Sequence, residues 1–231
     1  MPNSYIWQIL NTKKHIIIAI DGPSGTGKST TAKIVAKDLG LTYLDTGAMY
    51  RAITFAALEK NVAPTDKAGI DQLLQSTKIR FDDNNQIVIN GVNREKEIRG
   101  KQVSEAVSPY SAVPEVRSVL TQLQREIASE RSCILDGRDI GTVVFPNADF
   151  KFFLVTDLKV RAERRYQECK EKGIAMTFEE IEKNLAERDR IDSSRATAPL
   201  KKADDAIEID TTQLSIEQQV KKIEDRVGVV A

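Results

Sequence analysis

The chain has 231 residues, of which 41% are hydrophobic, and its 34 basic and 34 acidic residues cancel. This length suffices for one compact α/β domain with an insertion, or for two small domains. The neutral balance gives no overall field for nucleic acid or an anionic membrane, so any anion site must come from local clustering. No apolar run reaches the roughly 20 residues that span a bilayer. The two cysteines, Cys133 and Cys169, form neither a disulfide framework nor a metal-spaced cluster, so we expect a protein of the reducing cytoplasm.

Short β-like runs alternate with helical patterns along most of the chain. Residues 1–14 read as an N-terminal extension, without the basic segment and the small-residue cleavage site of a signal peptide. The alternation that follows is typical of a parallel, doubly wound sheet covered by helices. The five expected strands are 16–21, 41–45, 132–136, 150–155 and 206–210.

A glycine-rich loop follows the first expected strand. It reads Gly22-Pro23-Ser24-Gly25-Thr26-Gly27-Lys28-Ser29-Thr30 and leads into a helix expected over 28–39, which Gly40 ends. Such a loop turns backbone N–H groups toward phosphate oxygens, and the helix adds the positive end of its dipole. Lys28 is placed to reach the β- and γ-phosphates, and the Ser29 hydroxyl to bind Mg²⁺. A plain strand-to-helix turn is the alternative, but the context favours a nucleoside triphosphate site.

About 90 residues separate the second and third expected strands, which is more than one crossover helix needs. Within them, 78–81, 86–89 and 92–94 alternate apolar and polar residues around two turn sequences, which predicts a small antiparallel meander. We interpret 67–107 as an inserted subdomain that covers substrate; a passive surface elaboration is the alternative.

Three later helices are also expected. An amphipathic pattern predicts one that contains Val116 and Ile127 and runs to about Arg131. Capping boxes at 177–180 and 215–218 open the other two.

Arginines and aspartates gather just after the expected strands, where open α/β sheets bind ligands. The segments are 45–51, 136–142 and, later, 188–195. Phosphoryl transfer needs such clustered arginines and aspartates, because its transition state is stabilised by cations and by accurate positioning of the phosphates. The single histidine, His15, opens the first strand, so histidine acid–base catalysis is not expected.

Two further features have competing interpretations. Arg161, Arg164 and Arg165 share one helix face, which fits either a lid that closes over phosphates or a face that meets solvent. Asp136 ends an apolar strand, where an acidic residue either helps to hold Mg²⁺ or caps the following turn.

With these residues in view, the chain resembles the bacterial cytidylate kinases over about His15 to Arg226. The resemblance is carried by four motifs in order, at 20–28, 44–51, 136–146 and 188–195. It implies a P-loop α/β/α fold of three layers with a five-stranded parallel sheet, a short lid over about 157–175, and an enlarged nucleoside-monophosphate (NMP)-binding insertion. The core would comprise 15–66 and 108–231, and the protein would act as a monomer.

The resemblance also implies an activity and the residues that perform it. The activity is transfer of the γ-phosphoryl group from ATP to CMP or dCMP, with Mg²⁺ and without a covalent intermediate. ATP would bind 22–30 with Arg161, Arg164 and Arg165, and Mg²⁺ would bind Ser29, with Asp136 as a further candidate. The acceptor nucleotide would bind Thr46, Tyr50, Arg51, Ser108, Arg117, Asp136, Arg138, Asp139, Arg188, Asp192 and Arg195.

Within that set, the resemblance assigns particular roles. Arg51, Arg138 and Arg195 would hold the acceptor phosphate, and Ser108, Arg117 and Asp139 would read cytosine. Arg188 and Asp192 would bind the sugar, with Thr46 nearby. Lys28, Arg138, Arg188 and Arg195 would be catalytic. The chemistry of the two bases supports the assignment of Asp139. Its carboxylate can accept a hydrogen bond from the N4 amine of cytosine, but uracil carries the acceptor O4 at that position, so the carboxylate would have no donor.

Two features depart from what is usual in relatives: Thr46 stands where serine is frequent, and the extension is long. Ser29 keeps the usual Mg²⁺-binding hydroxyl, where some relatives carry glycine. Two alternatives stay open at this point. One is a kinase on the same core for UMP, AMP or a non-nucleotide acceptor. The other is a P-loop switch that hydrolyses nucleotide slowly, although the Asn-Lys-x-Asp motif of GTPases is absent.

Overall fold

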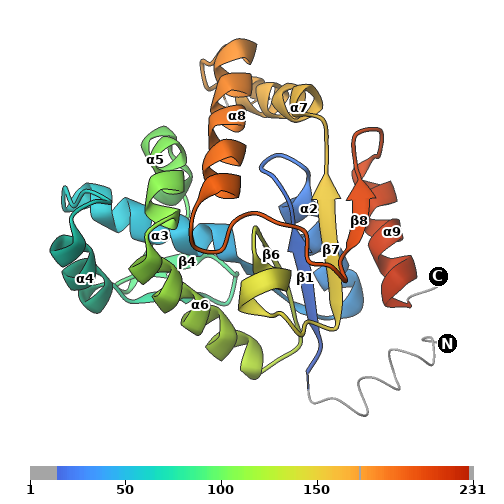
Figure 1. The fold of residues 1–231 in the computed structure, drawn as a ribbon, viewed down its shortest axis with the longest axis horizontal. Helices are drawn as coiled ribbons and strands as arrows, with labels where there is room; N and C mark the ends of the chain where they lie inside the picture. Colours follow the sequence, from blue (N-terminus) through green and yellow to red (C-terminus); the bar gives the residue numbers. More distant parts are fainter. Residues whose placement is uncertain (1–14, 172, 229–231) are drawn as a thin grey trace. The chain divides into compact units, whose positions relative to one another are not determined.

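The computed structural model describes residues 15–171 and 173–228 (Figure 1). The extension over 1–14 therefore lies outside the described residues. The described chain divides into two compact units: one contains residues up to Leu44 and from Ile127 onward, and the other contains Asp45–Glu126.

The first unit is built on a parallel sheet with the strand order β2-β6-β1-β7-β8. Its strands are β1 (Ile17–Asp21), β2 (Thr42–Asp45), β6 (Cys133–Gly137), β7 (Phe150–Val155) and β8 (Ile207–Asp210). The register pairs Ile17 with Cys133 across β1 and β6, and Ile18 with Phe150 across β1 and β7. The predicted α/β class and five-stranded sheet are confirmed, and each strand lies within two residues of its predicted bounds.

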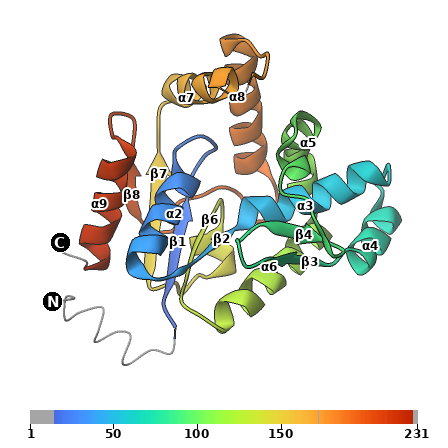
Figure 2. The same cartoon turned by 180° about the vertical axis from the view of Figure 1, so that it is seen from behind.

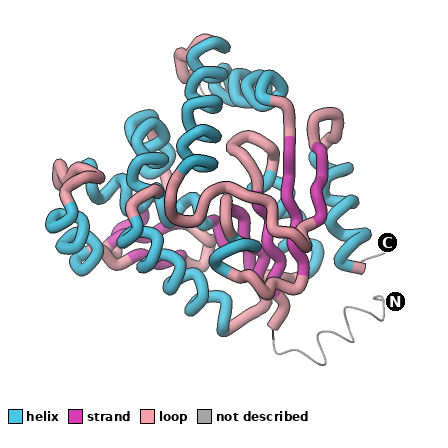
Figure 3. Tube along the Cα trace, viewed as in Figure 1, coloured by secondary structure: helices cyan, strands magenta, loops and turns pink. Residues whose placement is uncertain are grey.

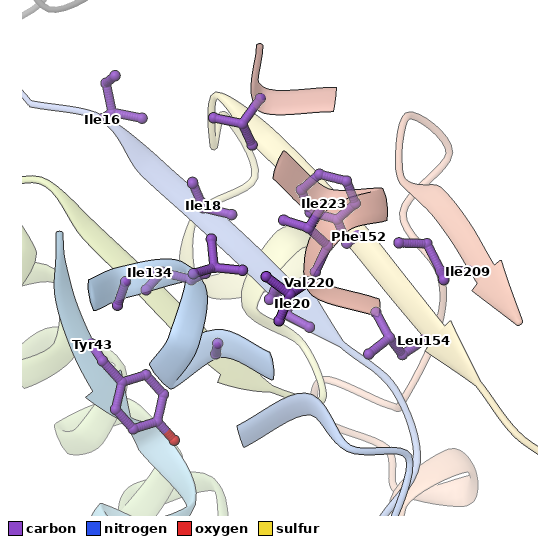
Figure 4. Close-up of a cluster of buried hydrophobic side chains, with 14 residues drawn as sticks. Ile16, Ile18, Ile20, Tyr43, Ile134, Phe152, Leu154, Ile209, Val220 and Ile223 are labelled. Atoms are coloured by element: carbon purple, nitrogen blue, oxygen red, sulfur yellow. The ribbon is translucent and has the colours of Figure 1, made fainter. Parts of the chain in front are cut away.

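Helices α2 (Lys28–Leu39) and α9 (Ile216–Val227) pack on one face of this sheet (Figure 2). Figure 4 shows the resulting core, in which Ile18, Ile20 and Phe152 of the sheet meet Val220 and Ile223 of α9. Helix α2 has the predicted bounds, because Gly40 adopts the left-handed conformation that ends it.

Helices α7 (Leu158–Glu171) and α8 (Phe178–Ser194) follow β7 and form a helical hairpin (Figure 3). Ala162, Cys169, Ile181 and Leu185 form a hydrophobic cluster between them, separate from the core on the sheet. The predicted capping boxes open α8 and α9, with Thr177 and Ser215 as the N-caps.

The second unit combines helices with a small antiparallel sheet in the order β3-β4-β5. Its elements are α3 (Thr46–Glu59), α4 (Lys67–Ser76), β3 (Ile79–Phe81), β4 (Ile87–Ile89), β5 (Val92–Asn93), the 3₁₀ turn η1 (Glu97–Arg99), α5 (Lys101–Ser111) and most of α6 (Pro114–Ser129). The predicted meander is thus confirmed, whereas α6 ends two residues before its predicted end at Arg131. The compact unit is wider than 67–107, and those narrower bounds stay a prediction.

Candidate active site

The loop after β1 leaves backbone N–H groups free to bind an anion. Gly27 precedes α2 in a left-handed conformation, with φ of 91°, and no side chain caps the helix. A side chain at Gly22 would overlap the carbonyl oxygen of Leu154. The first turn of α2 therefore offers uncapped donors and a positive dipole end, as a phosphate site requires.

Lys28 lies buried within this loop, with 4% of its surface exposed. Its Nζ donates to the carbonyl oxygen of Pro23 and, at 3.3 Å, to the hydroxyl of Thr26. Burial, followed by the charge of Arg138, lowers the pKa of Lys28 to about 7, although nearby carboxylates oppose this shift. An approaching phosphate would therefore stabilise the charged form of Lys28.

Ser29 and Asp136 lie 107 residues apart in the sequence and meet at the phosphate loop. The Ser29 hydroxyl donates to Asp136 Oδ2 at 2.7 Å, and the Tyr43 hydroxyl donates to Asp136 Oδ1 at 2.7 Å. A hydroxyl beside a carboxylate is a donor set that suits Mg²⁺, which takes one or two protein oxygens together with phosphates and waters. The residues therefore fit Mg²⁺, even though the described residues contain no cluster of three or more acidic, histidine or cysteine ligands.

A buried network of arginines and aspartates follows β6 and closes α8. Arg138 Nε donates to Asp192 Oδ2 at 2.8 Å, and Arg195 lies 3.5 Å from both Asp139 and Asp192. Burial raises the pKa of Asp192, but Arg138 and its neighbouring arginines outweigh burial and hold that pKa below its usual value. The network therefore keeps Asp192 ionised and holds the guanidinium groups of Arg138 and Arg195 in fixed directions.

Arg188 lies on the same helix, α8, and one of its hydrogen-bond donors has no partner among the described residues. Burial, followed by Arg138, lowers the pKa of Arg188 to about 10. Its buried Nε has no hydrogen-bond partner among the described residues. A buried donor without a partner is costly, so an incoming oxygen ligand would stabilise it.

The three arginines of α7 have different partners. Arg161 is 5% exposed and donates to the carbonyl oxygen of Ser24 in the phosphate loop at 3.0 Å, and to Asp189 at 2.7 Å. Arg164 donates to the carbonyl oxygen of Thr211. Arg165 forms a surface ion pair with Glu168, the arrangement expected of a solvent-facing residue. Of these three arginines, Arg161 is the one that hydrogen-bonds to the loop among the residues that the structure describes.

In the second unit, the predicted nucleotide-binding residues lie on α3, α5 and α6. Arg51 donates to the Ser104 hydroxyl at 3.0 Å. The Arg117 guanidinium lies 5.3 Å from the Tyr50 ring centre and donates to the carbonyl oxygen of Ser111. The remaining two, Thr46 and Ser108, are buried on α3 and α5.

Sequence reasoning missed three residues that organise the first unit's site. Tyr43 holds Asp136, Asp189 holds Arg161, and Asp21 accepts backbone hydrogen bonds from the turn after Arg138. Asp21 and Asp189 lie inside segments already singled out, so their polar character was visible. Their partners were not, because each lies far away in the sequence.

A glycine-rich loop that joins a central parallel strand to a helix, with a buried lysine and a Ser–Asp pair at its mouth, defines a P-loop nucleotide-binding protein. The family model described as cytidylate kinase matches residues 18–228. The chain is 50% identical over 208 residues to the cytidylate kinase of Clostridium tetani, which covers 90% of this chain and 92% of that protein. It is 49% identical over 212 residues to that of Listeria monocytogenes serotype 4a, with 91% and 95% covered. The chain belongs to the cytidylate kinase family.

Among solved structures, an uncharacterized protein from Eubacterium ventriosum is similar in fold. It has a TM-score of 0.50 and 13% identity, and the match covers 93% of this chain and 98% of that one.

In the part of the chain that the structure describes, no helix has the length and apolar character to cross a membrane.

Proposed function

We propose that this chain transfers the γ-phosphoryl group of ATP to CMP or dCMP. The observation that carries the proposal is the convergence, in one compact unit, of the phosphate loop, the Ser29–Asp136 pair and the Arg138–Asp192–Arg195 network. The first two suit a nucleoside triphosphate, and the third suits a second phosphate. Family membership names the acceptor, since the relatives quoted above are named cytidylate kinases.

On the donor side, residues 22–30 would bind the triphosphate of ATP, with Lys28 on the β- and γ-phosphates. Arg161 would hold the loop through Ser24, and the segment over about 157–175, which contains α7, would act as the lid. Ser29 and Asp136 would hold Mg²⁺, which when bound neutralises charge on the triphosphate.

On the acceptor side, the roles follow the family pattern. Arg51, Arg138 and Arg195 would bind the phosphate of CMP, and Arg188, Asp192 and Thr46 would bind the sugar. Ser108, Arg117 and Asp139 would read cytosine, with Tyr50 stacked on Arg117. Residues 67–107 would form the NMP-binding insertion.

The reaction would then be a direct, in-line displacement. An oxygen of the CMP phosphate attacks the γ-phosphorus, ADP leaves, and no enzyme nucleophile takes part. Arginine donors that are already oriented by Asp192 need little reorganisation to stabilise the charge of the transition state. We further propose that the protein acts as a monomer in the cytoplasm, which light scattering and cell fractionation can test.

The test is an ADP-release assay with ATP and Mg²⁺ and with CMP, dCMP, UMP, AMP, GMP or no acceptor. We expect fast turnover only with CMP and dCMP. A preference for UMP or AMP would assign a different nucleotide kinase to the same core. ADP release at the same rate with and without an acceptor would instead indicate a nucleotide hydrolase, as expected for a P-loop switch. Lys28→Ala is the control for activity from a contaminating kinase.

A further inference from the structure

Asp21 is a buried carboxylate for which the proposed mechanism has no use. It is the last residue of β1 and directly precedes Gly22, the first glycine of the phosphate loop. Only 4% of its surface is exposed. A carboxylate seldom lies buried at a strand end unless several donors satisfy it.

Both oxygens of Asp21 accept hydrogen bonds from one distant turn. Oδ1 accepts from the backbone N–H of Ile140 at 2.8 Å, and Oδ2 accepts from that of Gly141 at 2.7 Å. These two amides open the π-helical turn η2 (Ile140–Val144), which begins directly after Arg138 and Asp139. The side chain thus links the start of the phosphate loop to the segment that carries the proposed acceptor-binding residues.

A side chain at Gly141 would crowd this junction. A Cβ at Gly141 would lie 3.4 Å from Asp21 Oδ2 and 3.2 Å from Cδ of Lys151. Lys151 in turn donates to Pro146 and to both oxygens of Asp205, and so holds the far end of the same segment. Because Lys151 holds the far end of the segment, we expect a change at Asp21 to displace the end next to Arg138.

We propose that Asp21 is a positioning residue for phosphoryl transfer, which holds Arg138 and Asp139 in place relative to the phosphate loop. The inference rests on the proposed function, because it assigns Arg138 to the reacting phosphates. Asp21 does not touch substrate; it acts through the two amides of η2. An electrostatic role toward Lys28, which lies close enough for their charges to interact, is the competing explanation.

The test compares three variants. Asp21→Asn is isosteric but offers one acceptor where two are needed, and it removes the charge. Gly141→Ala crowds the same junction and leaves the Asp21 carboxylate in place. Asp149→Asn is the matched control, because Asp149 accepts a hydrogen bond from the backbone N–H of Ile17 at the opposite end of β1.

Since a misplacement of about 1 Å costs roughly 100-fold in rate, we expect Asp21→Asn to lower kcat by about 100-fold, Gly141→Ala by about tenfold and Asp149→Asn by less than about twofold. Amide hydrogen exchange should become faster at Ile140 and Gly141 in Asp21→Asn and stay unchanged there in Asp149→Asn. Loss of kcat in Asp21→Asn with full activity in Gly141→Ala would assign the effect to charge and overturn the proposal. Unchanged exchange at both amides would overturn it as well.

Two results separate this inference from the proposed function. If the wild-type protein fails to phosphorylate CMP, the function is wrong, yet the exchange measurement still decides whether Asp21 holds the turn. If Asp21→Asn does not fold, Gly141→Ala decides, and normal kcat in that variant would overturn the proposal.

Discussion

The charge of Lys28 depends on what lies beside it. Burial and Arg138 lower its pKa to about 7, so in the free protein a large fraction of the amine is neutral at pH 8. Phosphate oxygens would favour the ammonium form. We therefore expect nucleotide binding to be coupled to proton uptake at this residue.

We predict that ATP binding takes up a proton at pH 8 and takes up less at pH 6, where Lys28 is already charged. Calorimetric titrations in buffers of different ionisation enthalpy measure this uptake. Lys28→Met should abolish the difference and lower kcat by about 10²- to 10³-fold, as loss of an oxyanion donor does. The same proton uptake in Lys28→Met would place the titrating group elsewhere.

Asp139 combines two roles in the proposed site, because it lies 3.5 Å from Arg195 and is assigned to the cytosine N4 amine. Asp139→Asn should lower kcat with every acceptor, since Arg195 loses a charged partner. It should also lower the ratio of kcat/KM for CMP to that for UMP by roughly 5- to 150-fold, which corresponds to a loss of about 1–3 kcal/mol in discrimination. The ratio is its own control, and an unchanged ratio would move base recognition to another residue.

At the scale of elements, two helices with the same kind of cap differ in what they pack against. Thr177 and Glu180 cap α8 reciprocally, at 2.8 and 3.1 Å, and Ser215 and Gln218 cap α9 in the same way. Helix α9 belongs to the core on the sheet, whereas α7 and α8 share a small cluster of their own. Because this cluster is separate from the core on the sheet, we expect α7 and α8 to unfold locally before the sheet does.

We predict that Ser215→Ala lowers the global free energy of unfolding by about 1 kcal/mol, measured in urea. Thr177→Ala removes an equivalent cap, but its effect should appear mainly as faster hydrogen exchange within α7 and α8. The two variants serve as controls for each other. Equal losses of global stability would mean that the hairpin unfolds together with the sheet.

At the scale of the whole molecule, Asp21 makes stability depend on pH. Burial raises its pKa to about 6, although the amides of Gly141 and Ile140 oppose this shift; Asp139 raises the pKa further and Lys28 lowers it. Between pH 3.8 and 6, Asp21 is therefore mostly protonated in the folded protein and mostly ionised in the unfolded chain. The contribution of Asp21 is then present at low pH and is lost as the pH rises through 6.

We predict that the difference in unfolding free energy between the wild-type protein and Asp21→Asn falls by about 2.5 kcal/mol from pH 4 to pH 7. Urea unfolding of both proteins at each pH measures it. Comparison with the variant cancels the other carboxylates, such as Asp192, whose lowered pKa acts in the opposite direction. A difference that stays constant with pH would contradict the shift.

The sequence by itself determined the strand order along the chain, the phosphate loop, the helix caps and the meander. These features are encoded within a few residues of one another: an apolar run before Gly22, a Thr177–Glu180 spacing, a turn at Asn90-Gly91. Helix α6 shows the limit of such reasoning. Its amphipathic pattern continues toward Arg131, yet the helix ends at Ser129, two residues earlier.

Only the tertiary structure decided which polar groups become partners. Asp21 meets Ile140, Ser29 meets Asp136 and Arg161 meets Ser24 across more than 100 residues of sequence each. No local pattern encodes these pairs. The order of the strands in the sheet sets them, because β1 lies between β6 and β7 and so brings the ends of all three strands to the same edge. The same helix face carries Arg161, Arg164 and Arg165, but only the first two bond to distant segments, at Ser24 and Thr211; among the described residues Arg165 pairs with Glu168 of its own helix.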